Sequence, residues 1–264
     1  MLTFESVTYR HAGGVRPAID DVSLELGEGE VVGLVGGNGS GKSTLCLIAA
    51  GLAPRIVGGT LSGRILIDGE DIAPMPMHEL VARVAIGFDD PWTQLSGVTG
   101  TVYEEVAFGP ANLGMPRDEL VSRVDAALSS LAIEQLAARD PAHLSGGQQQ
   151  LVAIAGLLAM GPRHIVLDEP TAQLDPSGTS LVANAIERLA SEGASVLVVE
   201  HKTDLIARVA KRLVVLAGGT IVMEGAAAEL LADPRLRDLG VREPSAVRLR
   251  RRLVEAGLDP VALA

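Results

Sequence analysis

G-G-N-G-S-G-K-S-T, residues 36–44, decides the fold of this chain. The stretch matches the pattern G-x-x-x-x-G-K-[ST], in which a glycine-rich turn joins a strand to a helix. Residues 30–35 before it form an apolar run that predicts a buried strand, and apolar residues at helical spacing follow it. The glycines let successive backbone N–H groups face a phosphate, and the dipole of the following helix adds positive charge there. This context predicts a binding site for a nucleoside triphosphate.

Two side chains of this loop are expected to contact the phosphates and their metal ion. Lys42 would neutralise the β- and γ-phosphates, and the Ser43 hydroxyl would bind Mg²⁺. The alternative, an ordinary glycine loop, is disfavoured by the Lys-Ser pair that follows the last glycine. The other loop residues expected to hold the nucleotide are Gly36, Asn38, Gly39, Gly41 and Thr44.

Length and composition restrict the class of protein. The 264 residues suit one large domain with an appendage, and only 2% are aromatic, so the core must be aliphatic. The net charge of −11 argues against a general nucleic-acid binder. The single cysteine, Cys46, is expected to be a small buried apolar residue, which excludes a disulfide scaffold. No signal peptide is visible, and the uncharged residues 144–162 contain too short an apolar run to span a bilayer. We therefore expect a soluble chain, and nothing contradicts a reducing cytoplasm.

Alternating strands and helices predict an α/β fold with a parallel sheet covered on both faces. Residues 2–9 and 19–26 alternate apolar and polar, as half-buried strands joined by a hairpin-like link do. A helical block between Asp89 and Pro162 is inserted into the sheet. Further strands are expected at 64–69, 84–88, 164–168, 194–199, 213–216 and 220–223, and helices at 101–108, 117–131, 148–160 and 177–191.

A second motif, H-I-V-L-D-E-P at residues 164–170, is an apolar strand with two carboxylates at its end. Asp168 could hold Mg²⁺ directly or through water, and Glu169 could polarise an attacking water. A strand that ends in Asp-Glu is weak evidence alone, since many loops begin that way. Together with the phosphate loop, it indicates a site for ATP and Mg²⁺.

A third motif, L-S-G-G-Q at residues 144–148, lies just before a predicted helix. Ser145 fits an N-cap, and Gly146 and Gly147 leave backbone N–H groups open at a positive helix end. The alternative is a simple capped helix start. Because it lies between a phosphate loop and an Asp-Glu strand, the pentapeptide resembles the signature of ABC-type ATPases.

Other motifs of that family have counterparts here. Residues 172–175, A-Q-L-D, resemble the D-loop, and His201 in V-V-E-H-K resembles the switch histidine. The resemblance covers residues 2–225 and implies a P-loop, RecA-like mixed sheet with N-terminal antiparallel strands. It implies a nucleotide-binding core at 1–90 and 163–225, a helical signature subdomain at 91–162, and a small C-terminal helical extension at 226–264.

Two more stretches resemble the energising ATPases of energy-coupling factor (ECF) transporters, bacterial and archaeal importers of vitamins and transition-metal ions. They are F-D-D-P-W-T-Q-L-S at 88–96 and T-V-Y-E-E-V-A-F-G-P-A-N-L-G at 101–114. The tail, with L-G-V-R-E-P-S at 239–245, resembles the extension through which such ATPases pair. The resemblance implies three partners at the cytoplasmic face of the membrane: a second ATPase, identical or paralogous, a membrane coupling subunit and a substrate-capturing membrane subunit.

Two positions depart from the family pattern. Asp89 stands where the family has its Q-loop glutamine, and Gln94 matches a different glutamine of the ECF pattern. Asp89 could keep an oxygen on the Mg²⁺ side, or it could cap the turn at Pro91. His11 aligns with the aromatic residue that stacks on adenine, and Tyr9 on the same strand face is the alternative.

The resemblance implies a composite site between two ATPase chains. Lys42 and its loop would hold ATP, and Ser145, Gly146 and Gly147 of the other chain would cap the γ-phosphate. The expected catalytic residues are Glu169, His201 and Lys42.

The membrane subunit is expected to dock near residues 92–112, where Trp92 either docks or packs its own loop. The competing interpretation is a soluble non-transport ABC ATPase, such as an assembly scaffold or regulatory factor. An exporter ATPase is normally fused to membrane spans, and a P-loop kinase or GTPase does not explain residues 144–148.

Overall fold

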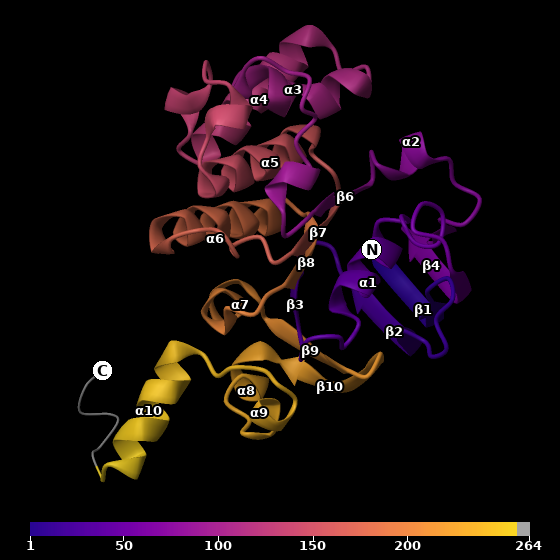
Figure 1. Ribbon diagram of the computed structural model, residues 1–264, viewed down its shortest axis with the longest axis vertical. Coiled ribbons are helices and arrows are strands. Elements are labelled where there is room, and N and C mark those ends of the chain that lie inside the picture. Colours follow the sequence, from indigo (N-terminus) through magenta and orange to yellow (C-terminus); the bar gives the residue numbers. More distant parts are fainter. Residues whose placement is uncertain (258–264) are drawn as a thin grey trace.

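A computed structural model describes residues 1–257 of the chain, so part of the expected extension, residues 258–264, lies outside the described residues (Figure 1). The N-terminal region forms an antiparallel sheet in the order β2-β1-β4-β5. Buried and exposed residues alternate along β2 from Val22 to Leu26, as the sequence pattern predicts. The strands are β1 (Leu2–Arg10), β2 (Ile19–Leu26), β4 (Thr60–Ile67) and β5 (Glu70–Asp71).

A second sheet of six strands carries the site. Its order is β10-β9-β3-β8-β7-β6, with parallel pairing from β9 to β6 and an antiparallel β10 at one edge. This arrangement confirms the predicted mixed α/β fold. The strands are β3 (Val31–Val35), β6 (Val84–Gly87), β7 (His164–Asp168), β8 (Ser195–Val199), β9 (Arg212–Ala217) and β10 (Thr220–Ala226).

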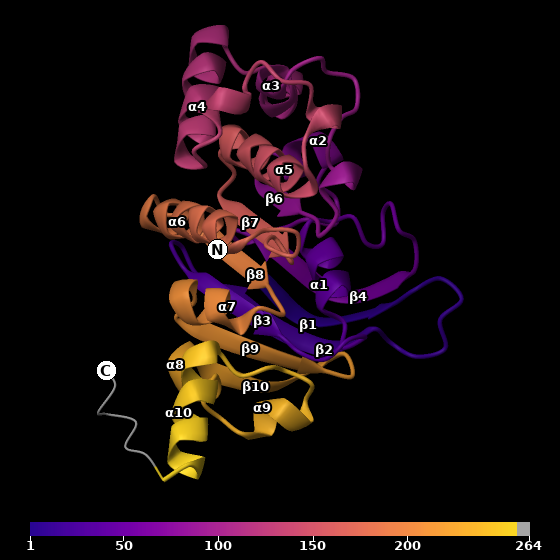
Figure 2. The ribbon, with the colours of Figure 1, turned by 60° about the vertical axis from the view of Figure 1, so that its left-hand side comes forward.

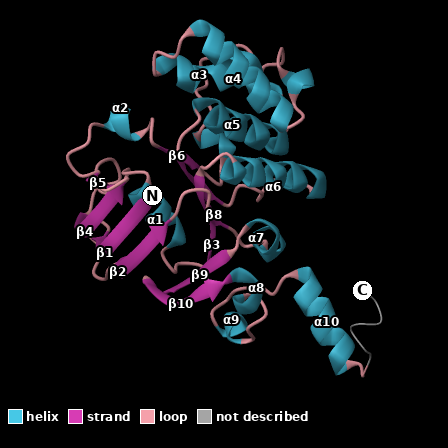
Figure 3. Cartoon of the chain, turned by 180° about the vertical axis from the view of Figure 1, so that it is seen from behind, coloured by secondary structure: helices cyan, strands magenta, loops and turns pink. Residues whose placement is uncertain are grey.

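Alternate residues of the six-stranded sheet enter two different hydrophobic cores. Val32 and Leu34 pack with the antiparallel sheet and α1 (Lys42–Ala49), whereas Val31 and Val35 pack with the helices of the other face. Successive side chains of a strand point to opposite faces, so a wholly apolar strand requires a cover on each. Cys46 of α1 is buried, as predicted. Figure 3 shows β1, β2 and β4 beside α1.

Helices gather at the end of the molecule beyond β6 (Figures 1 and 2). α3 and α4 both contact α5, and α6 covers the sheet next to them. α5 begins at Gly146, within the L-S-G-G-Q motif, and ends where Gly161 adopts a left-handed conformation. The helices are α2 (Met77–Leu80), α3 (Val102–Asn112), α4 (Arg117–Ser130), α5 (Gly146–Met160), α6 (Pro176–Ser191) and α7 (Thr203–Val209), with 3₁₀ turns at Pro91–Thr93, Glu134–Leu136 and Pro141–His143.

The C-terminal segment folds back against the nucleotide-binding side. It contains α8 (Ala227–Leu230), α9 (Arg235–Asp238) and α10 (Ser245–Glu255), the last of which has no buried residue and projects from the body (Figure 3). The link between α9 and α10 is tied to the start of α7: the Thr203 hydroxyl donates to the Arg242 carbonyl at 2.9 Å. The Asp204 carboxylate accepts from the Ser245 N–H at 2.7 Å. No helix within residues 1–257 is long and apolar enough to cross a membrane.

Candidate nucleotide-binding site

Three loops meet at the carboxyl edge of the parallel sheet. β3 leads into the phosphate loop, β7 ends at Asp168 and is followed by Glu169, and β8 leads to His201. Because β8 lies between β3 and β7, His201 is placed between the phosphate loop and the two carboxylates. Open α/β sheets bind their ligands at this edge.

The backbone of the phosphate loop requires glycine at two of the predicted positions. A Cβ at Gly36 would lie 2.2 Å from the carbonyl oxygen of Leu216, and one at Gly41 would lie 2.5 Å from that of Ala18. Gly41 is also left-handed, with φ 108°, and it precedes α1 without a side-chain cap. The first N–H groups of α1 therefore stay open toward a ligand, as phosphate binding requires.

Lys42 is positioned by this loop. Its side chain is buried, and Nζ donates to the carbonyl oxygens of Gly36 at 2.9 Å and Gly37 at 3.1 Å. Burial lowers the pKa of Lys42, while the charges of Glu169 and Asp168 oppose that shift. A buried ammonium group is favourable only with partners of opposite charge or dipole, so this position suits an anionic ligand.

Asp168 has the character of a metal ligand. The residue is 7% exposed, and its Oδ1 is buried with no hydrogen-bond partner. Burial is the main cause that raises the pKa of Asp168; a hydrogen bond from Ser43 opposes the shift, and the charges of Glu169 and Asp89 add to it. An unpaired buried acceptor is costly, and a cation beside Ser43 and Asp168 would satisfy it. These residues therefore fit the predicted Mg²⁺ position. Within residues 1–257 no three His, Cys, Asp or Glu side chains form a metal cage, but Mg²⁺ held through a carboxylate and phosphates needs none.

Glu169 and His201 are in direct contact. His201 Nε2 lies 3.0 Å from Glu169 Oε1, and both side chains remain partly exposed. Glu169 has φ 51°, an unusual value for a residue other than glycine, and its N–H donates to the Val199 carbonyl at 2.9 Å. Both residues and the phosphate loop line one cavity of about 620 Å³. Backbone strain of this kind persists where the surroundings enforce it, which is common at functional sites.

The structure separates the two candidates for adenine stacking. Tyr9 is fully buried and its hydroxyl donates to the Gly58 carbonyl, so its ring has no free face for a base. His11 is exposed, and its Nε2 lies 3.3 Å from Thr44 Oγ1 at the start of α1. The Tyr9 and His11 rings form a T-shaped pair, with 4.9 Å between ring centroids and 83° between ring planes. This geometry favours His11 as the base-facing residue.

Two glutamines hold the segment that carries Asp89. The Phe88 N–H donates to Gln94 Oε1 at 3.2 Å, and the Phe88 carbonyl accepts from Gln150 Nε2 at 3.3 Å. Asp89 itself is exposed, and it is Asp90 whose carboxylate caps the turn at Pro91. Sequence reasoning did not assign a role to Gln150, since helical spacing alone gives no sign of this contact.

The signature residues lie apart from the phosphate loop. Ser145 forms a capping box with Gln148, and a Cβ at Gly146 would lie 2.3 Å from Gln173 Oε1 in the D-loop. Among the hydrogen bonds of residues 1–257, none joins residues 145–147 to the phosphate loop. One chain thus brings together Lys42, Asp168, Glu169 and His201 and leaves the signature elsewhere.

Comparison with known proteins identifies the family. Residues 19–172 match the ABC transporter family over more than half of the chain. This chain belongs to that family. The ABC transporter assignment is consistent with the phosphate loop, the Asp-Glu strand and the L-S-G-G-Q motif, each in its expected place.

Relatives of this ABC transporter chain confirm the resemblance to ECF ATPases. The energy-coupling factor transporter ATP-binding protein EcfA of Enterococcus faecium is 38% identical over 98% of this chain and 91% of the relative. The structure of cbiO1 from Clostridium perfringens, described as part of the ABC transporter complex cbiONQ, has a TM-score of 0.77 at 34% identity, over 95% of this chain and 98% of that one.

Other relatives differ in length or state. A dimeric ATP-binding cassette solved after hydrolysis with ADP and Pi has a TM-score of 0.74 at 31% identity, over 86% of this chain and 99% of that one. The chain spans only 43% and 40% of two longer ATP-binding relatives, from Methanosarcina mazei and Methanosarcina acetivorans, which are each 39% identical to it.

Proposed function

We propose that this chain is the ATP-hydrolysing subunit of an ECF-type ABC importer for a vitamin or a transition-metal ion. The observation that carries the proposal is the 3.0 Å contact between His201 Nε2 and Glu169 Oε1, next to Lys42 and Asp168. A carboxylate held by an imidazole beside a phosphate loop is suited to activate water for attack on a γ-phosphate.

Binding is assigned to the phosphate loop and its neighbours. The open N–H groups of α1 and Lys42 hold the phosphates, and Lys42 exchanges its present carbonyl partners for phosphate oxygens. Gly36, Asn38, Gly39, Gly41 and Thr44 form the rest of the cradle. His11 covers the adenine.

Catalysis is assigned to the residues after β7 and β8. Glu169 accepts the proton of the attacking water, and His201 orients the Glu169 carboxylate through its Nε2 contact. Ser43 and Asp168, with Asp89 on the outer side, hold Mg²⁺, which when bound neutralises charge on the phosphates. The raised pKa of Asp168 is explained by the burial that such a cation would compensate.

A second ATPase chain completes the site in this proposal. Ser145, Gly146 and Gly147 lie apart from the phosphate loop of their own chain, so they are free to cap the γ-phosphate of a partner. The dimeric state of a relative bound to ADP and Pi supports this arrangement.

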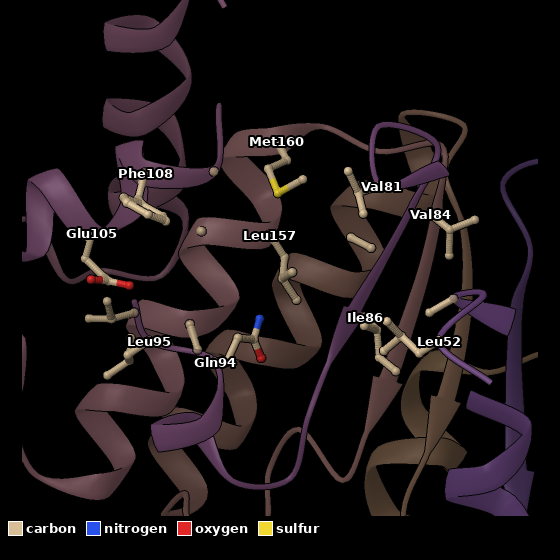
Figure 4. A pocket seen from close by; sticks show the side chains of 16 residues that line it. Leu52, Val81, Val84, Ile86, Gln94, Leu95, Glu105, Phe108, Leu157 and Met160 are labelled. Carbon is tan, nitrogen blue, oxygen red and sulfur yellow. The ribbon is translucent and has the colours of Figure 1, made fainter. Parts of the chain in front are cut away.

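The docking site for the membrane coupling subunit is assigned to an apolar groove of about 250 Å³ between β6 and the helical block (Figure 4). Figure 4 shows Leu157 and Met160 between the Phe108 side and the Val81 side of the groove. The groove includes Gln94, Leu95, Glu105, Phe108 and Gly109 of the predicted docking stretch 92–112. Trp92 beside it is 59% exposed, so it does not pack its own loop as the alternative required. The third subunit, which captures the substrate, and the peripheral position at the membrane follow from the ECF resemblance.

Substitution of Glu169 tests the central assignment. In a complex purified with its membrane partner, Glu169→Gln should keep ATP binding and stabilise the paired state, while ATP turnover falls by about 10²–10⁴. Turnover close to that of the parent would remove Glu169 from the role of general base. A parent protein that purifies without any membrane protein and hydrolyses ATP alone would instead favour a non-transport ATPase.

A further inference from the structure

The two residues that flank His201 both bind residues 171–174, the segment that runs from Thr171 into the D-loop. Glu200 also borders the cavity that contains Glu169 and His201. Glu200 is 2% exposed, and its Oε1 accepts from the Thr171 N–H at 3.0 Å and from the Thr171 hydroxyl at 2.5 Å. Thr171 is fully buried, so these two donors have no access to water. A charged acceptor with two buried donors makes hydrogen bonds of the stronger class.

Lys202, which follows His201 in the sequence, binds the same segment as Glu200, which precedes it. Its Nζ donates to the Thr171 carbonyl at 2.6 Å and to the Leu174 carbonyl at 3.2 Å. Its own N–H donates to Glu200 Oε2 at 3.2 Å, which joins the two flanking residues. The N–H, hydroxyl and carbonyl of Thr171 are thus all held by the neighbours of His201.

The other side of the D-loop faces the signature residues. A Cβ at Gly147 would lie 3.2 Å from the Gln173 carbonyl oxygen, and one at Gly146 would lie 2.3 Å from Gln173 Oε1. The D-loop therefore lies between the signature residues and the His201 segment. A displacement of this loop cannot leave His201 in place unless the bonds of Glu200 and Lys202 break.

We propose that Glu200 and Lys202 are positioning residues, which make the D-loop and His201 move as one body. Contact of the D-loop with a second ATPase chain then sets the distance between His201 and Glu169 in the same chain. This inference rests on the proposed function, because it assumes that a second chain seats against the signature side. Pairing and the geometry of the general base then become one event.

Substitution of Lys202 tests the proposal with a matched control. Lys202→Met keeps the length of the side chain and removes the ammonium, and it should lower kcat about 10- to 100-fold, as misplacement of a catalytic group does. The ATP Kd, measured in the Glu169→Gln background, should stay within about twofold, and Lys202→Arg should restore most of kcat.

The control is Lys211→Met, the same change at an exposed lysine outside the site, which should match the parent. A kcat for Lys202→Met within twofold of the parent overturns the proposal, as does a fall in ATP affinity and melting temperature that accounts for the whole loss.

A second measurement does not depend on turnover. In the parent, hydrogen exchange of the amides in residues 171–175 and 200–203 should slow together when ATP and the partner chain are added. In Lys202→Met, residues 171–175 should still respond while residues 200–203 do not. If both segments remain coupled in Lys202→Met, the proposal fails. A parent that shows this coupling without any ATP hydrolysis refutes the proposed function and leaves the coupling intact, so the two failures are distinguishable.

Discussion

Asp89 lies close enough to Asp168 for its charge to raise the pKa of that buried carboxyl, although the two form no hydrogen bond with each other in residues 1–257. Aspartate in place of the glutamine of the family pattern adds a charge and removes an amide donor. A carboxylate near the γ-phosphate repels it unless Mg²⁺ lies between them. Closure of this site should therefore depend more strictly on Mg²⁺ than closure of a site with glutamine at this position.

Substitution of Asp89 measures that dependence. Asp89→Ala should raise the Mg²⁺ concentration needed for half-maximal ATPase activity, because a metal-side oxygen is lost. It should not weaken metal-free nucleotide binding, because the lost carboxylate repels the phosphates there. Asp89→Gln should come close to the parent. The measurement is a Mg²⁺ titration of ATP hydrolysis, and superimposed curves for the parent and Asp89→Ala would show that this carboxylate is structural.

His164, at the start of β7, is expected to lower the free energy of unfolding as the pH falls into the acid range. Burial is the main cause that lowers the pKa of His164 from 6.5 to about 4, and its Nδ1 lies 2.5 Å from Ser195 Oγ. Between pH 6.5 and about 4 the unfolded chain binds the proton and the folded chain does not. Stability is therefore complete above pH 6.5 and is lost as the pH falls, by up to about 3 kcal/mol from this group. His164→Gln should flatten the decline of unfolding free energy between pH 7 and 4.5 in urea titrations. Equal slopes for parent and variant would contradict this assignment.

At the scale of elements, substitutions can test whether the membrane subunit docks in the groove between β6 and the helical block. Phe108 of α3 is 40% exposed and lines the groove, whereas Leu113 just after α3 is 38% exposed and lies outside it. Phe108→Asp should abolish co-purification with the membrane subunit, because it places a charge in an apolar docking surface, and ATP binding should persist. Leu113→Asp is the matched control. Equal recovery of the membrane protein by both variants would place the docking surface elsewhere.

The sequence predicted those elements whose signal is local. The apolar runs of β3, β7 and β8 predicted these strands, and the motifs beside them singled out Lys42, Asp168 and Glu169 as candidate site residues, because strand period and glycine spacing are local properties. The contacts of Lys202 with the Thr171 and Leu174 carbonyls were not predicted, since nothing in V-V-E-H-K indicates which loop its neighbours bind. The approach of Gly240 to Gly37 was not predicted either, because no local pattern in the sequence indicates where the C-terminal segment packs.

At the scale of the whole molecule, the last described helix, α10, is amphipathic, and none of its residues is buried by the rest of residues 1–257. In α10, Leu249 is 57% exposed and shares a helix face with Leu253, one turn further on. If this helix pairs two ATPases, as the resemblance of the C-terminal extension implies, Leu249→Glu should weaken nucleotide-free pairing and shift the protein toward single chains. The readout is molar mass by light scattering over a range of concentrations. Val222→Glu, at a 45% exposed position on β10, is the control. An unchanged mass for Leu249→Glu would exclude α10 from the pairing surface.

Gly240 approaches Gly37 so closely that a Cβ on Gly240 would lie 3.2 Å from the Gly37 Cα, and Gly240, Val241 and Arg242 form a wall of the cavity that contains Glu169. The segment that leads to α10 is thus also part of the cavity that contains Glu169. If α10 pairs two chains and pairing displaces this wall, ATP binding and pairing are linked, and the linkage is reciprocal. Whatever factor ATP applies to the association of two extensions, that association must apply to the affinity for ATP. Nucleotide and partner chain then act as heterotropic ligands of each other, and the apparent ATP affinity varies with the concentration of the protein itself.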